Sequence, residues 1–155
     1  MPLAWVTCLT ENGPNYSYFA KHCKKVKGLT PYLNRATQLL YSDRHKGIPA
    51  FEKFFDCGVA DCIGHIEKNV RRLIGERGGK VGFHKSQLHK LQKEHTEEGY
   101  QKALDKLRRG FPEVAEYMDK LDHAKTYLYA ILKRGYTTHR HSTSNIAEIV
   151  NSFLK

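Results

Sequence analysis

A change in hydrophobic periodicity divides this sequence and constrains its fold more than any other feature. Up to about residue 74, short apolar runs alternate with stretches in which apolar residues recur at helical spacing. From His84 to Arg134 only the helical spacing is present. Alternating strands and helices are typical of an α/β domain, and a purely helical stretch after them indicates a separate block. We therefore predict an α/β fold that carries an all-helical insertion.

The α/β part is predicted to contain three strands, each followed by a helix. These strands are expected at Leu3–Leu9, Gln38–Ser42 and Cys57–Asp61. The helix after the second strand should have an apolar face from Ile48 to Phe55, whereas residues 28–34 carry a proline and are predicted as a loop. One more amphipathic helix is expected from Ile146 onward. The predicted domains are residues 1–82 with 135–155 for the α/β core and 83–134 for the insertion.

Composition excludes several classes of protein. A chain of 155 residues with 40% hydrophobic residues can form a core, and it has no low-complexity tract that would indicate disorder. Its apolar runs are too short for a signal peptide or a membrane-spanning helix, so no membrane partner is expected. The four cysteines, Cys8, Cys23, Cys57 and Cys62, are few and irregularly spaced, and we predict free thiols.

The charge of the chain favours a polyanionic partner. Lysine and arginine number 26 against 16 acidic residues, which gives a formal net charge of +10. Such a charge favours nucleic acid first and an acidic membrane surface second, while a solvated basic surface is the simpler alternative. Basic residues cluster at Lys21–Lys27 and from Lys68 to Arg109, and the candidate nucleic-acid contacts within these clusters are Lys21, Lys24, Lys25, Lys68, Arg71 and Arg72.

Two acidic residues occupy positions that suit catalysis and also suit helix capping. Asp43 follows the Gln38–Ser42 strand, at the end where α/β sheets place catalytic groups, but it could instead cap the next helix. Glu148 lies one turn into the last helix, and its spacing from Asn145 is that of a capping box. Taken singly, both positions favour the capping role.

Cys62 and His65 are spaced so that both side chains lie on one face of a helix. Two ligands at this spacing are half a zinc site, and the other half would have to come from Cys57, His139 or His141. Nothing in the spacing selects among these three residues. A buried cysteine and a packed histidine form the simpler interpretation, and zinc is not an expected cofactor.

Four motifs follow one another in a distinctive order. They are Pro2-Leu3-Ala4-Trp5-Val6 with Glu11-Asn12, Ser42-Asp43-Arg44-His45-Lys46-Gly47-Ile48, Cys62-Ile63-Gly64-His65, and Thr143-Ser144-Asn145-Ile146-Ala147-Glu148. This order, with a helical insertion between the last two motifs, resembles the transposase domain of Mutator-like elements. The resemblance covers essentially the whole chain.

The resemblance implies an RNase H-like fold in which an acidic triad binds two divalent metal ions, Mg²⁺ or Mn²⁺. These ions activate the attacking water or 3′-hydroxyl and stabilise the leaving oxygen. Asp43 matches the family's second acidic residue and Glu148 its third. Cys62 and His65 match a Cys-x-x-His motif beside the active site, which implies a role in positioning or DNA contact. DNA as partner and a nuclear location are implied as well.

One departure from the family changes the expected activity. In the family, the first aspartate and two strands precede the Pro-Leu-Ala segment, which here is residues 2–4. Glu11, Asp56 and Asp61 do not occupy the place of that aspartate in the order. The expected protein is thus a fragment with an incomplete RNase H-like sheet, inactive alone. Its first strand would pair directly with the Gln38–Ser42 strand, or a second copy or the missing amino-terminal segment would fill the gap.

Two alternatives to the enzyme fragment stay open. One is a non-catalytic DNA- or protein-binding remnant of a transposase. The other is a decayed gene piece without function. The presence of all four matching residues, Asp43, Glu148, Cys62 and His65, speaks against long decay.

Overall fold

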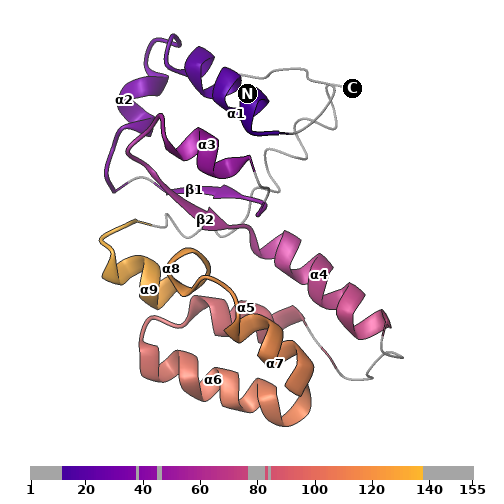
Figure 1. The fold of residues 1–155 in the computed structure, drawn as a ribbon. Coiled ribbons are helices and arrows are strands. Elements are labelled where there is room, and N and C mark those ends of the chain that lie inside the picture. The colour runs from indigo at the N-terminus through magenta and orange to yellow at the C-terminus, as the bar shows by residue number, and fades with distance from the viewer. Residues whose placement is uncertain (1–11, 38, 45–46, 77–82, 84, 138–155) are drawn as a thin grey trace. The chain divides into compact units, whose positions relative to one another are not determined.

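The computed structural model describes residues 12–37, 39–44, 47–76, 83 and 85–137, and Figure 1 labels its elements. The strands are β1 (Leu39–Ser42) and β2 (Gly58–Asp61), which are neighbours in one parallel sheet. The helices are α1 (Gly13–Cys23), α2 (Leu29–Leu33), α3 (Ile48–Glu52), α4 (Ile63–Glu76), α5 (Lys85–Lys93), α6 (Glu97–Gly110), α7 (Pro112–Asp119), α8 (His123–Thr126) and α9 (Leu128–Lys133). The described part is therefore mixed α/β and mostly helical.

The chain divides into two compact units. The first unit extends up to Val59 and resumes at Tyr136, and the second is continuous from Ala60 to Gly135. The insertion predicted at residues 83–134 lies within the second unit. Helix α4, which the sequence assigns to the α/β core, also belongs to the second unit because it packs against α5 and α7.

In the first unit, helix α1 begins with a side-chain cap at Asn12. The side-chain oxygen of Asn12 accepts a hydrogen bond from the backbone N–H of Asn15 at 2.9 Å. Pro14 stands in the first turn, where a missing N–H costs nothing. Helix α1 packs against α3. The buried core of this unit includes Ala20, Cys23, Leu29, Leu33, Phe55 and Cys57.

The first unit is closed by the short segment that follows the second unit. The backbone N–H and the hydroxyl of Thr137 both donate to the carbonyl oxygen of Thr37, each at 3.1 Å. The ring of Tyr136 lies so close to Gly58 that a Cβ there would come within 2.6 Å of it. The first unit is thus built from segments about a hundred residues apart in the chain.

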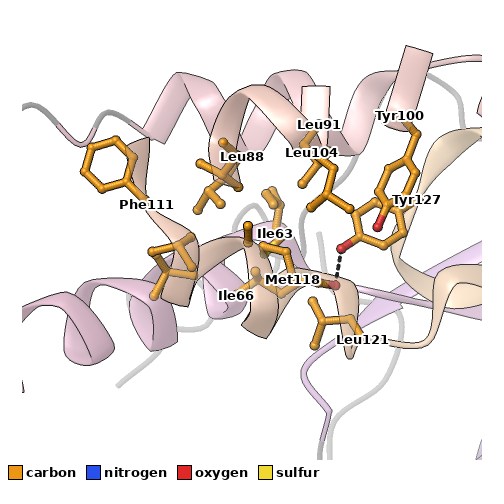
Figure 2. Close-up of a cluster of buried hydrophobic side chains, with 14 residues drawn as sticks. Ile63, Ile66, Leu88, Leu91, Tyr100, Leu104, Phe111, Met118, Leu121 and Tyr127 are labelled. Atoms are coloured by element: carbon orange, nitrogen blue, oxygen red, sulfur yellow. Dashed lines mark hydrogen bonds between the residues drawn. The ribbon is translucent and has the colours of Figure 1, made fainter. Parts of the chain in front are cut away.

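The second unit has a larger core, which Figure 2 shows in close-up. Helix α4 contributes Ile63, Ile66 and Val70, whose spacing places them on one helical face. The remaining buried side chains converge on them from α5 onward: Leu88, Leu91, Tyr100, Leu104, Leu107, Phe111, Val114, Ala115, Met118, Leu121 and Tyr127. The dashed line in Figure 2 marks the bond that the Tyr127 hydroxyl donates to the Met118 carbonyl.

Helix α6 shows why this stretch is helical. Its N-cap, Thr96, accepts a hydrogen bond from the backbone N–H of Gly99 at 3.0 Å. Acidic residues fill its first turn and Arg108 and Arg109 its last turn, which complements the helix dipole. The side chains of Tyr100, Leu104 and Leu107 on α6 and of Val114, Ala115 and Met118 on α7 are buried at helical spacing, so the helical prediction for this region is confirmed.

Two local predictions in the first unit are wrong. Residues 29–33 form α2 although a loop is predicted there. Pro31 is the third residue of this helix and needs no hydrogen-bond partner for its nitrogen in the first turn. Helix α3 ends at Glu52, so Phe55 lies beyond it, yet the Phe55 side chain is buried in the core. Burial of its aromatic side chain, and not helical periodicity, accounts for this apolar residue.

The predicted strand at Leu3–Leu9 and the predicted helix from Ile146 lie outside the described residues. The pairing of the first strand, and any gap beside it, therefore stay predictions. The strands predicted at Gln38–Ser42 and Cys57–Asp61 are confirmed as β1 and β2, each with bounds slightly shorter than predicted.

Candidate functional site

Asp43 directly follows β1, as the sequence predicts. Its side chain is half-buried, and its Oδ1 lies 3.5 Å from the Ser42 hydroxyl, which donates to it. Helix α3 begins at Ile48, so the residue that precedes it is Gly47. Asp43 lies four positions before Gly47 and does not take the N-cap place of that helix. The capping alternative for Asp43 is thereby excluded.

Glu148 lies outside the described residues, as do Asn145, His139 and His141. The expected meeting of the Asp43 and Glu148 carboxylates is therefore a prediction, and so is the capping alternative for Glu148. Within the described residues, no group of three or more His, Cys, Asp or Glu side chains could hold a metal ion. This finding does not bear on the predicted magnesium site, since that site needs Glu148.

Cys62 and His65 stand at the beginning of α4. Cys62 directly precedes the helix, and its carbonyl oxygen accepts the backbone N–H groups of His65 at 3.1 Å and Ile66 at 3.2 Å. The Cys62 side chain is only 1% exposed, and His65 is half-buried in the first helical turn. These two residues belong to the second unit, whereas Asp43 belongs to the first.

The three described cysteines, Cys23, Cys57 and Cys62, are buried and form no disulfide. Burial raises the pKa of the Cys23 thiol. Burial also raises the pKa of the Cys57 thiol, and the carboxylates of Glu52 and Asp56 raise it further. Protonated thiols are poor nucleophiles and metal ligands, so Cys23 and Cys57 serve as small apolar core residues.

A second acid stands at the end of β2. Asp61 is only 6% exposed, and the Thr126 hydroxyl donates to its Oδ2 at 2.8 Å. Thr126 is fully buried and ends α8. A buried carboxylate requires hydrogen-bond partners, and this bond therefore links α8 to the end of β2. The arrangement gives Asp61 a structural role.

The basic residues selected from the sequence are all exposed. Lys21, Lys24 and Lys25 lie at the end of α1, and the Lys24 ammonium is 5.7 Å from the centroid of the Phe54 ring. On α4, the Arg71 guanidinium binds the Glu67 carboxylate at 2.8 Å, which compensates part of its charge. Lys68 forms no ion pair with any other described residue, and Arg72 is exposed beside it.

A polar cluster between α6 and α9 was not recognised in the sequence. The Tyr129 hydroxyl lies 2.8 Å from His123 Nδ1, and the Tyr100 hydroxyl donates to Asp119 Oδ1 at 3.3 Å. Burial raises the pKa of Tyr100, and the nearby Asp119 carboxylate raises it further. In the sequence, Tyr100 lies at helical spacing from Leu104 and Leu107, so it is interpreted as an apolar core residue and the hydrogen bonds of its hydroxyl are not predicted. These bonds join α6 to the α7–α9 segment.

Comparisons of the chain with protein-family models, with curated proteins and with solved structures found no match. Among the helices of the described residues, none is long and apolar enough to span a membrane.

Proposed function

We propose that this chain belongs to the RNase H-like catalytic domain of a Mutator-like transposase and that, alone, it binds DNA without cleaving it. It carries two of the three carboxylates that such a site requires, Asp43 and Glu148. No acid in the sequence takes the place of the first. Two-metal cleavage needs ligands that hold both ions, so an incomplete set should not support it.

The observation that carries the proposal is the position of Asp43. A carboxylate that follows a strand in an α/β sheet, and that caps no helix, is placed as ligand-binding groups of such sheets are placed. The order of elements also supports the proposal. Parallel strands β1 and β2 flank a helix, and a continuous helical unit follows before the chain returns to the first unit at Tyr136.

The net charge of +10 supports DNA as the partner. Lysine and arginine side chains that neutralise phosphates release counterions, so binding of this kind is independent of sequence and weakens steeply with salt. A nuclear location and Mg²⁺ or Mn²⁺ as the metal would accompany this function. The Mg²⁺ ligands would be Asp43 and Glu148, because hard cations prefer carboxylate oxygens.

Incubation of the purified chain with supercoiled plasmid and Mg²⁺ or Mn²⁺ tests the proposal. We expect retarded migration of the plasmid, which reports binding, and no nicked product. Asp43→Asn is the matched variant, and it should behave as the unmodified chain does. Metal-dependent nicking that disappears in Asp43→Asn would show that the site is complete. A crystal structure with Mn²⁺ in which the Asp43 and Glu148 carboxylates lie much more than about 10 Å apart would contradict the two-metal assignment.

A further inference from the structure

A groove of about 600 Å³ lies between α5 and α6 of the second unit. We name it the α5–α6 groove. One wall includes Lys90 and Glu94, and the other includes Lys102, Lys106 and Leu107. Its volume falls within the range of sites that bind small ligands or segments of larger ones. Lys90, Lys102 and Lys106 lie within the basic cluster that the sequence predicts from Lys68 to Arg109, but the sequence singles out none of the three as a contact.

The α5–α6 groove is electropositive. Three lysines and one glutamate line it. The Lys102 ammonium pairs with the Glu98 carboxylate at 2.6 Å, but both side chains are more than 70% exposed, so water screens this pair and it holds Lys102 weakly. Lys90 and Lys106 form no ion pair with other residues that the structure describes. At least two ammonium groups are thus available to an anion in the groove.

The spacing of the lysines suits an extended anion better than a compact one. Lys102 and Lys106 are one turn apart on α6, which separates them by about 6 Å along the helix axis. Lys90 faces them from α5. A polymer with repeated negative charges can meet all three ammonium groups at once, whereas a single small anion would meet fewer of them.

The side chains that line the groove also indicate which polyanion it takes. No aromatic ring and no guanidinium lines it among the described residues. Carboxylates are best recognised by the two parallel hydrogen bonds of arginine, whereas lysine acts as a point charge toward phosphate. Bases would need a ring on which to stack. The groove therefore fits the phosphate backbone of nucleic acid better than an acidic peptide or a base.

We propose that the α5–α6 groove binds the phosphate backbone of a nucleic-acid strand through Lys90, Lys102 and Lys106. This inference rests on the proposed function, because it locates the DNA contact of the same protein. It also assigns that contact to lysines of α5 and α6, whereas the individual residues that the sequence favours lie on α4 and at the end of α1. Binding at the groove is independent of base sequence, since contacts to phosphates carry no sequence information directly.

Two double variants of the full chain test the proposal. Lys90→Gln/Lys106→Gln removes two charges from the groove, and Lys53→Gln/Lys133→Gln removes two charges from exposed positions that are not candidate contacts, one just after α3 and one on α9. Binding of a labelled oligonucleotide, single-stranded or duplex, is followed by fluorescence anisotropy from 50 to 200 mM salt, roughly the range over which phosphate contacts are lost. Circular dichroism confirms that both variants are folded.

We expect the groove variant to bind about tenfold more weakly and to lower the salt slope of log K by about 2, as the loss of two phosphate contacts requires. The matched variant should change both quantities much less. Equal losses in the two variants would show diffuse surface charge and overturn the inference. Binding by the unmodified chain that the groove variant leaves intact would overturn it too, while the proposed DNA binding would stand.

Two further outcomes separate the inference from the proposed function. If the unmodified chain binds no DNA at all, the proposed function fails with it. Competition by polyglutamate, or by inorganic phosphate, that equals competition by unlabelled oligonucleotide at the same charge concentration would show that the groove does not select a nucleic-acid strand. Competition by oligonucleotide alone supports the proposal.

Discussion

The two units of this chain build their cores from different kinds of contact. In the second unit, the buried side chains come from helices that follow one another directly, and the pairs that pack together include α5 with α6 and α6 with α7. In the first unit, closure depends on Thr137 bonding back to Thr37 and on Tyr136 lying against Gly58. Local contacts cost little loop entropy, whereas contacts across a hundred residues require the intervening chain to be ordered first.

This difference also divides the candidate functions. Asp43 lies in the first unit, which depends on long-range contacts, and the α5–α6 groove lies in the second, which depends on local ones. DNA binding should therefore need only the locally built unit, whereas any catalysis would need the first unit to be intact. The comparison thus predicts that changes in one unit leave the stability of the other largely intact.

A core deletion in the second unit gives the largest expected effect. Leu88 is fully buried among the helices of that unit, and Leu88→Ala should lower its free energy of unfolding by about 2–5 kcal/mol because a cavity is left behind. Amide hydrogen exchange measures each unit separately. Protection should fall in Ala60–Gly135 and persist around α1.

The control for this change is Leu132→Ala. Leu132 is 39% exposed on α9 of the same unit, so its loss should change stability by no more than about 0.5 kcal/mol. If Leu88→Ala instead removed protection from both units equally, they would unfold as one, and the comparison between them would break.

The sequence predicts the second unit, with its local contacts, better than the first unit, with its long-range contacts. Helices α4, α6, α7 and α9 were predictable because buried residues such as Leu104 and Leu107 recur at the helical period, whereas α5 and α8 were predicted only as part of a helical region. In the first unit, Pro31 favours a loop in the sequence where the structure has α2, and helical periodicity extends the next helix to Phe55 although it ends at Glu52. There, tertiary contacts and not local periodicity decide which apolar residues are buried.

The candidate site was predictable only in part. The place of Asp43 after a strand followed from a short apolar run bounded by polar residues, and the structure agrees. The α5–α6 groove was missed because its lysines come from two helices, and only packing brings Lys90 toward Lys106. One sequence feature does indicate a basic surface on α6: Lys102 and Lys106 flank the apolar stripe that includes Leu107.

A glycine substitution in each unit tests the comparison with a change in stability of intermediate size. In the first unit, a Cβ on Gly47 would overlap the ring of Tyr16, so Gly47→Ala should destabilise that unit by about 1–3 kcal/mol. In the second unit, Gly75 lies in α4 with open space around it, and Gly75→Ala should stabilise that helix by about 0.5–1 kcal/mol.

Urea unfolding followed by far-ultraviolet circular dichroism measures the stability change of both glycine substitutions. Amide hydrogen exchange shows which unit each substitution affects. The informative result is the opposite sign of the two effects, each confined to its own unit. A neutral Gly47→Ala would mean that the Tyr16 ring moves aside freely, and the tight packing of α1 near α3 would then not be a determinant of the first unit.

The smallest expected effects come from the two helix caps, which offer a matched pair. Asn12→Ala removes the acceptor for the Asn15 N–H in the first unit, and Thr96→Ala removes the acceptor for the Gly99 N–H in the second. Each change should cost about 1 kcal/mol of stability in its own unit, because one N–H at the helix start loses its partner. Asn12→Asp and Thr96→Ser keep an acceptor oxygen and should keep most of the stability.

Thr96→Ala should also leave DNA binding unchanged, because Lys102 and Lys106 lie one turn or more inside α6, where the loss of the cap does not change the helix. Weakened binding by Thr96→Ala would show that fraying at the helix start reaches the α5–α6 groove. Equal losses of protection in both units from either cap variant would show that the units share one stability.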